Sequence, residues 1–164
     1  MGSRPLHFRA SVFAPKKTPM KAPIEQTSRI ETKPRILVIE DEPAVSILLV
    51  KILKCHGFDV CAAATGIGGL RLIGEQSCDL ILSDIDLPDI DGFEICRRIK
   101  QNPKLRFVPV ILMSGRLAEE NEALALKLGA VDYVSKPFRV ENIVNKVSAH
   151  IQGAKSAVYE TRRH

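Results

Sequence analysis

What the chain lacks already narrows its fold class. It contains no tryptophan, and aromatic residues make up only 5% of its 164 residues, whereas hydrophobic residues make up 45%. Any core must therefore be built mainly of Leu, Ile and Val. The apolar content also excludes a chain that is disordered throughout. The length suits one domain with some additional tail.

Long hydrophobic runs and paired cysteines are absent as well. No run of about 18 apolar residues is present, so the sequence predicts no membrane-spanning helix and no membrane partner. The four cysteines form no CxxC pair, which argues against a zinc site or a redox dithiol. Each lies in or beside an apolar run, and packed, reduced thiols are typical of cytoplasmic proteins. We therefore expect a cytoplasmic location.

Positive charge is concentrated at the two ends of the chain. The formal net charge is +5, but residues 1–33 alone hold seven Lys or Arg against two Glu, together with four Pro. Residues 34–151 carry a net charge of −2. We predict a flexible, basic, proline-containing arm over residues 1–33, a folded domain over residues 34–152 and a short basic tail over residues 153–164.

The folded part alternates short apolar segments with helical patterns. Strands are predicted at residues 35–39, 58–63, 80–84, 107–113 and 131–134. Helices are predicted from residue 43 up to Gly57 and at residues 65–76, 92–101, 117–128 and 139–152. Five βα units in succession indicate an α/β fold, in which a five-stranded parallel sheet carries helices on both faces. Gly57 and Gly129 are expected to end the first and fourth helices, and Asp91 to cap the third.

Apolar residues at helical spacing predict the buried faces of these helices. In the first helix they are Val45, Leu48, Leu49, Ile52 and Leu53; in the third, Phe93, Cys96 and Ile99; in the last, Val140, Ile143, Val144, Val147 and Ile151.

The second helix is rich in glycine. Gly66, Gly68, Gly69 and Gly74 each weaken a helix by roughly 1 kcal/mol relative to Ala. Because this stretch follows a strand, a phosphate-binding loop is the alternative. The spacing fits neither GxGxxG nor a P-loop, so we interpret it as a loosely formed helix.

Polar residues follow four of the five strands. Glu40 and Asp41 follow the first strand, Asp84 ends the third, Ser114 follows the fourth and Lys136 follows the fifth. The carboxyl ends of parallel strands share one edge, where open α/β sheets bind ligands. Three clustered carboxylates repel one another unless a cation lies among them, and Mg²⁺ prefers such oxygen ligands. A carboxylate nucleophile, a divalent ion, an ammonium and a hydroxyl can together accept a phosphoryl group.

Three motifs make this pattern specific. They read ILVIEDEP at residues 36–43, LILSDIDLPDIDG at residues 80–92 and YVSKPF at residues 133–138. Residues 34–152 resemble a response-regulator receiver domain, the CheY-like family of two-component signalling. The resemblance implies a flavodoxin-like (βα)5 fold with strand order 2-1-3-4-5.

The resemblance also assigns the metal and phosphorylation sites. It implies that Asp84 is the phospho-acceptor and that Asp41 and Asp84 bind Mg²⁺ directly. Glu40 would assist through a water molecule, and the backbone carbonyl of Asp86 would be a further ligand. Glu40 stands where Asp is more usual, and Asp86 where Met or Asn is typical. We expect the side chain of Asp86 to affect the lifetime of the phosphoryl group.

The remaining implied roles concern the response to phosphorylation. Ser114 would hydrogen-bond the phosphoryl group, Lys136 would pair with it, and the ring of Tyr133 would rotate to follow Ser114. Gly115 leaves room for a donor or an attacking water. The peptide bond between Lys136 and Pro137 would be cis, which is a minority choice for X-Pro bonds in general.

The function implied is that of a single-domain response regulator or phosphorelay receiver. It would take a phosphoryl group from a phosphohistidine on a histidine kinase or histidine phosphotransfer protein, with Mg²⁺ as its cofactor. It would not be an enzyme beyond catalysing its own phosphorylation and dephosphorylation. The face made by the fourth helix, fifth strand and fifth helix would contact a downstream protein, and a homodimer through that face is a further option.

Two other functions remain as alternatives. Asp84, Ile85 and Asp86 match the DxD motif of haloacid-dehalogenase phosphohydrolases, although that family carries the motif on its first strand and needs a longer chain with a cap. The basic arm of residues 1–33 could instead bind nucleic acid, which would give a steep salt dependence. Charged tails are more often simply solvated, so we do not expect nucleic acid among the partners.

Overall fold

The computed structural model of the chain describes residues 32–115 and 119–161. The predicted arm, apart from its last two residues, and the last three residues of the predicted tail lie outside these ranges. The elements are β1 (Arg35–Ile39), α1 (Pro43–Cys55), β2 (Asp59–Ala63), α2 (Gly66–Glu75), β3 (Leu80–Asp84), α3 (Gly92–Gln101), β4 (Val110–Ser114), α4 (Glu119–Lys127), β5 (Asp132–Ser135) and α5 (Val140–Thr161).

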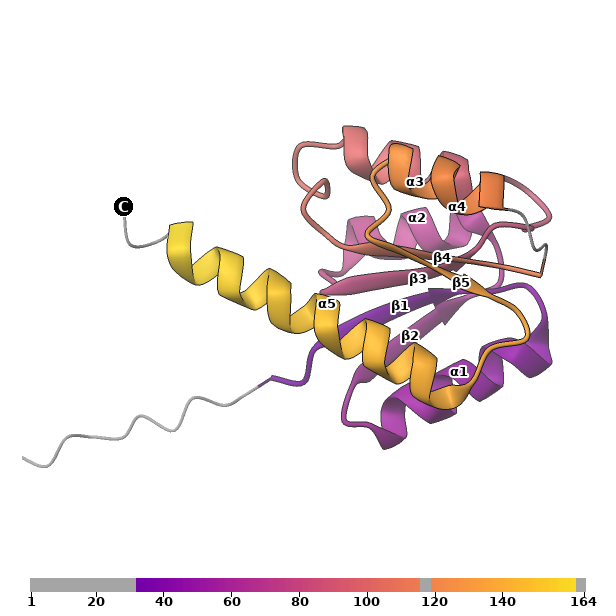
Figure 1. The fold of residues 1–164 in the computed structure, drawn as a ribbon, viewed down its shortest axis with the longest axis horizontal. Helices are drawn as coiled ribbons and strands as arrows, with labels where there is room; N and C mark the ends of the chain where they lie inside the picture. The colour runs from indigo at the N-terminus through magenta and orange to yellow at the C-terminus, as the bar shows by residue number, and fades with distance from the viewer. Residues whose placement is uncertain (1–31, 116–118, 162–164) are drawn as a thin grey trace, which may run out of the picture. The chain divides into compact units, whose positions relative to one another are not determined.

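All five strands form one parallel sheet in the order β2-β1-β3-β4-β5. The predicted α/β class and strand order are thus confirmed. Helices α1 and α5 cover one face of the sheet, and α2, α3 and α4 cover the other (Figure 1). All strand ends that carry the predicted site residues therefore lie at the same edge.

The core consists of two layers, one on each face of the sheet. Side chains alternate between faces along β1, so Ile36 and Val38 pack toward α1 and α5, while Leu37 and Ile39 pack toward α2 and α3. Strands β3 and β4 are buried over their whole length. This two-sided burial explains why both strands begin with an unbroken apolar run, Leu80–Leu82 in β3 and Val110–Met113 in β4, instead of alternating.

The predicted helix caps are confirmed. Gly57 and Gly129 have φ angles of +87° and +96°, in the left-handed region that ends helices with glycine. The carboxylate of Asp91 accepts a hydrogen bond of 2.7 Å from the backbone N–H of Glu94, as an N-cap residue does.

Strand β4 begins three residues later than predicted. Phe107 is 78% exposed, and its ring lies 4.7 Å from the guanidinium of Arg106. The backbone N–H of Val108 bonds to the carbonyl of Leu105, which keeps this segment in a turn instead of the sheet. The prediction of a strand from residue 107 was therefore wrong. The apolar residues Phe107 and Val108 belong to a turn, and Pro109 separates this turn from the strand that begins at Val110.

Two helix predictions also need correction, and a third falls partly outside the described residues. Leu48 and Val140, both predicted to be buried, are 47% and 38% exposed. The last helix does not end at residue 152 but continues to Thr161, so most of the predicted tail is helical. The fourth helix begins at Glu119, and the two earlier residues predicted for it are outside the described ranges.

The four cysteines are free thiols in different surroundings. Cys55 is exposed at the end of α1, whereas Cys61 and Cys78 are half-buried and Cys96 is buried. Burial raises the pKa of all three shielded thiols, that of Cys78 to about 12. Among the described residues, no helix is both long and apolar enough to cross a membrane.

Candidate functional site

Three carboxylates meet at the carboxyl edge of the sheet. Glu40 and Asp41 follow β1, and Asp84 is the last residue of β3, the neighbouring strand. One oxygen from each carboxylate lies within 4.8 Å of the other two. Glu40 and Asp84 are only 1% and 5% exposed, while Asp41 is exposed. The structure thus brings together the acids that the sequence placed at one edge.

Lys136 places one ammonium between two of these acids. Its Nζ lies 2.7 Å from Oε2 of Glu40 and 3.0 Å from Oδ2 of Asp84. The lysine follows β5, and its backbone N–H donates a 2.7 Å hydrogen bond to the carbonyl of Ser114 at the end of β4. The peptide bond between Lys136 and Pro137 is cis, as predicted.

Backbone hydrogen bonds fix the directions of the two buried carboxylates. Oδ1 of Asp84 accepts a 2.8 Å hydrogen bond from the N–H of Ile85, which leaves Oδ2 toward Lys136. Oε1 of Glu40 accepts from the N–H of Glu42 at 3.2 Å, which leaves Oε2 toward the same ammonium. Each carboxylate therefore presents one oxygen to the centre of the site.

The carboxylates of the site outnumber its one ammonium, so a further cation would be stabilised there. Burial raises the pKa of Glu40 above its ordinary value, although the hydrogen bond from Lys136 acts in the opposite direction. Burial disfavours the charged ammonium of Lys136, but its contacts with Glu40 and Asp84 outweigh this and raise its pKa. The site holds three carboxylates and only one ammonium. The carboxylates are hard oxygen donors, the kind of ligand that Mg²⁺ prefers.

The other predicted site residues lie around this centre. Ser114 is buried at the end of β4, and Tyr133 is buried in the adjacent strand β5. Asp86 is exposed in the loop after β3. A β-carbon on Gly115 would meet nothing within 4 Å among the described atoms. Residues 116–118, which follow Gly115, lie outside the described ranges, so the space expected beside Ser114 stays a prediction.

The structure also shows contacts that the sequence analysis missed. The carboxylate of Asp89, in the loop after β3, accepts hydrogen bonds of 2.8 Å from the backbone N–H groups of Gly66 and Ile67 at the start of α2. These partners are 22 and 23 residues away in sequence, and no local motif signals such a pairing. Asp89 thereby connects the loop that follows Asp84 to a helix on the sheet face.

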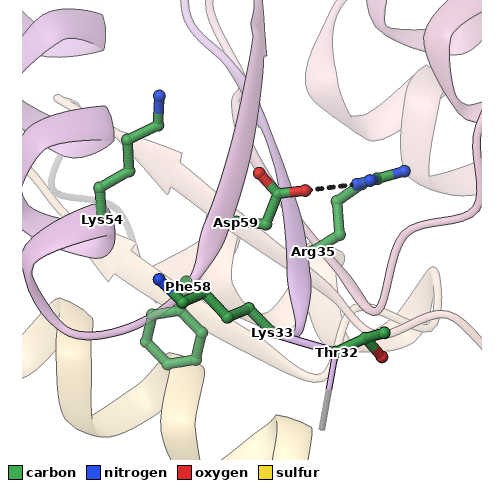
Figure 2. A pocket seen from close by; sticks show the side chains of 6 residues that line it. All are labelled: Thr32, Lys33, Arg35, Lys54, Phe58 and Asp59. Atoms are coloured by element: carbon green, nitrogen blue, oxygen red, sulfur yellow. Dashed lines mark hydrogen bonds and ion pairs between the residues drawn. The ribbon is translucent and has the colours of Figure 1, made fainter. Parts of the chain in front are cut away.

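A cavity of about 510 Å³ lies at the opposite, amino edge of the sheet, where β1 and β2 begin. It is lined by Thr32, Lys33, Arg35, Lys54, Phe58 and Asp59. Figure 2 shows the cationic groups spread around Asp59, which pairs with Arg35 at 2.8 Å, with no common point toward which they converge. None of the predicted site residues lines this cavity.

Comparison with known proteins identifies the folded part of the chain. A family model described as the response regulator receiver domain matches residues 36–148. The phosphate regulon transcriptional regulatory protein PhoB of Rhizobium meliloti is 37% identical over 128 residues, which cover 78% of this chain and 56% of PhoB. RpaA of Synechocystis sp., named a DNA-binding dual master transcriptional regulator, is 37% identical over 116 residues, covering 71% of this chain and 48% of RpaA. The chain spans about half the length of both relatives.

Solved structures agree with this match. A CheY-like receiver domain protein from Methanospirillum hungatei superposes with a TM-score of 0.72 at 28% identity, covering 77% of this chain and 99% of the other. The signal receiver domain of a histidine kinase from Syntrophus aciditrophicus gives a TM-score of 0.69 at 31% identity, covering 73% and 91%. Together with the acidic edge described above, these matches show that the chain belongs to the response regulator receiver domain family of two-component signalling, whose members are signalling domains and not classical enzymes.

Proposed function

We propose that Asp84 accepts a phosphoryl group from a phosphohistidine on a histidine kinase or a histidine phosphotransfer protein. The observation that carries this proposal is the setting of Asp84. Its carboxylate is buried at the carboxyl edge, lies 3.0 Å from the ammonium of Lys136, and belongs to a cluster with Glu40 and Asp41. The chain would act as a response regulator or a relay receiver in the cytoplasm.

The acidic cluster would hold Mg²⁺. Asp41 and Asp84 would be direct ligands, Glu40 would act through a water molecule, and the backbone carbonyl of Asp86 would complete the protein ligands. When bound, the ion would neutralise charge on the transferring phosphoryl oxygens. The three acids supply the oxygen donors that this requires.

In the transfer itself, an oxygen of the Asp84 carboxylate attacks phosphorus. The new P–O bond forms while the P–N bond to the donor imidazole breaks, and the imidazole leaves with the electron pair of that bond. Lys136, already within 3.0 Å of Asp84, remains close enough to pair with the added charge. The hydroxyl of Ser114 would donate to a phosphoryl oxygen.

The output would be a population shift in the packing of one face. Ser114 and Lys136 would be drawn toward the phosphoryl group, and the ring of Tyr133 would follow. The face formed by α4, β5 and α5 would then change its preference for a downstream protein or a second copy of the chain. Leu124 and Leu126 on α4 are 41% and 50% exposed, so this helix offers apolar contact area at the surface.

A phosphorylation assay tests the proposal. The protein is incubated with Mg²⁺ and the small-molecule phosphodonor phosphoramidate, and its intact mass is measured before and after mild alkali, which cleaves acyl phosphates. We expect one base-labile phosphoryl group on the unaltered protein and none on Asp84→Asn. Asp59→Asn is the matched control, because it makes the same substitution at the opposite edge of the sheet, away from the acidic cluster, and should still be labelled.

Two results would contradict the proposal. One is unchanged labelling of Asp84→Asn. The other is steady release of phosphate from small monoesters over many turnovers, which would favour a haloacid-dehalogenase-like hydrolase. Asp84 and Asp86 lie at and after β3, however, not on the first strand where that family carries its paired aspartates.

A further inference from the structure

Helix α2 packs against β1 through a glycine. Gly69 is buried, and a β-carbon on it would overlap the side chain of Ile39. Ile39 is itself fully buried and is β-branched, so its side chain has little freedom to move aside. Ile39 directly precedes Glu40 and Asp41. The distance between α2 and the strand end that carries these two acids therefore depends on the missing side chain at residue 69.

The same face of α2 packs against the loop that follows Asp84. Gly66 is three residues before Gly69 and is also buried. A β-carbon on Gly66 would lie 2.5 Å from Cγ1 of Ile90 and 3.1 Å from the carbonyl oxygen of Ile90. The two glycines thus bring one helix into close contact with both acid-bearing segments.

Asp89 attaches this loop to α2 by hydrogen bonds. Its two carboxylate oxygens accept from the backbone N–H groups of Gly66 and Ile67, at 2.8 Å each. The bond from Ile67 is the main cause of a lowered pKa of Asp89. The next N–H group, that of Gly68, donates to Oγ1 of Thr65 at 3.0 Å. The start of α2 is therefore saturated by partners that fix its position.

The loop is closed directly on Asp84 at its other end. The N–H of Gly92 donates a 2.9 Å hydrogen bond to the carbonyl of Ile85. A β-carbon on Gly92 would overlap the carbonyl oxygen of Asp84 and lie 2.8 Å from the Cα of Ile85. The loop is thus held at both ends, by Asp89 on α2 and by Gly92 against Asp84, so a shift of α2 is expected to move Asp84 as well.

We propose that Gly66, Gly69 and Asp89 are positioning residues that make α2 a brace, holding Glu40 and Asp41 at a set separation from Asp84. This inference rests on the proposed function, because that separation matters for binding Mg²⁺ and for phosphoryl transfer. The brace also accounts for the glycines of α2. Gly66 and Gly69 are needed for close approach, whereas Gly74 has nothing within 4 Å of an added β-carbon among the described atoms.

Magnesium affinity separates a positioning role from a merely stabilising one. The dissociation constant of Mg²⁺ is measured by following the amide signal of Ile85, which bonds to Asp84, in NMR spectra. We expect Gly69→Ala and Asp89→Ala to weaken binding about tenfold, as loss of groups that orient metal ligands does. Gly74→Ala is the matched control, the same substitution in the same helix, and should bind within about twofold of the unaltered protein.

Crystal structures of the variants give a readout that needs neither Mg²⁺ nor a phosphodonor. In Gly69→Ala and Asp89→Ala, Lys136 should no longer reach both Glu40 and Asp84, which it contacts at 2.7 and 3.0 Å in the unaltered chain. Should Gly69→Ala fail to fold, Asp89→Ala decides, because residue 89 is exposed and its truncation leaves the core intact.

The positioning role of α2 is contradicted if Gly69→Ala and Asp89→Ala both bind Mg²⁺ within about twofold of the unaltered protein. It is also contradicted if Lys136 keeps both of its contacts in these variants. A wild-type protein that binds Mg²⁺ but cannot be phosphorylated would overturn the proposed function and leave the brace to be judged by the affinities. A wild-type protein that binds no Mg²⁺ would leave the crystal structures to decide.

Discussion

The two edges of the sheet use the same kinds of charged residue in opposite ways. At the carboxyl edge, the buried acids Glu40 and Asp84 share the single ammonium of Lys136, with Asp41 beside them. At the amino edge, Arg35 and Asp59 form a one-to-one pair whose side chains are 40% and 47% exposed. Two buried carboxylates thus share one ammonium at the carboxyl edge, whereas the carboxylate of Asp59 has an exposed cationic partner of its own.

The pKa values of two acids show the same difference. Burial raises the pKa of Glu40 at the carboxyl edge. The hydrogen bond from Arg35 lowers the pKa of Asp59 at the amino edge. A raised pKa means that the folded protein resists the charged form that metal binding requires, and a bound cation would reverse this. The pKa shifts of these two acids thus have opposite signs, because burial dominates at Glu40 and the bond to Arg35 dominates at Asp59.

The largest expected effect comes from removing the shared ammonium. Lys136→Met leaves Glu40 and Asp84 buried without their cation, so we expect a loss of about 3 kcal/mol in the free energy of unfolding in EDTA. Saturating Mg²⁺ should recover most of this loss, because the ion would supply the missing positive charge. Urea denaturation with and without Mg²⁺ measures both values. An equal loss of stability in the two conditions would show that the carboxyl edge does not use Mg²⁺ to balance its buried acids.

An intermediate effect is expected at the start of β5. Asp132 bonds to Lys146 at 2.5 Å and to His150 at 3.0 Å. Burial acts to raise the pKa of Asp132, but the bonds from Lys146 and His150 outweigh it and the pKa is lowered. Asp132→Asn should therefore cost about 1 kcal/mol at pH 7.

The pH dependence of this effect follows from the sign of the shift. An acid whose pKa is lowered on folding stabilises the protein above its ordinary pKa, here 3.8, and loses that contribution as the pH falls through the folded-state value. The difference in stability between Asp132→Asn and the unaltered protein should thus shrink below pH 3.8. Phosphorylation of Asp84 serves as the control and should not change at neutral pH.

The smallest effect is expected at the exposed pair of the amino edge. Arg35→Met removes the partner of Asp59, but exposed ion pairs contribute little and are screened by salt. We expect no measurable change in unfolding by urea in 0.15 M salt, and no change in Mg²⁺ affinity. A changed Mg²⁺ affinity would show that the amino edge affects the acidic cluster at the carboxyl edge, so the two edges could not be treated as independent.

The sequence predicted the site better than it predicted the surfaces. Glu40, Asp84 and Lys136 could be placed because strands buried on both faces are easily recognised, and the topology then brings their carboxyl ends together. Phe107 could not be placed in the same way, since an apolar residue in a turn looks like the start of a strand until its hydrogen bonds are known. Leu48 was misplaced because helical spacing does not show how wide a stripe the sheet covers.

The contacts of the proposed brace could not be predicted from the sequence, for a different reason. Asp89 finds its partners 22 and 23 residues away, in contacts that exist only after the chain has folded. Gly69 was interpreted as a residue that weakens a helix, because its propensity is visible in the sequence while the side chain of Ile39 above it is not. Close approach between elements is a property of the folded packing, and propensities do not report it.

The four cysteines offer a practical consequence for such measurements. Cys55 is exposed at the end of α1, while burial raises the pKa of Cys61, Cys78 and Cys96 and so suppresses their thiolates. A maleimide dye should therefore attach first at Cys55, without any engineered substitution. The native chain can thus carry a single fluorophore on the sheet face opposite α2, which would report on partner docking without disturbing the glycine contacts.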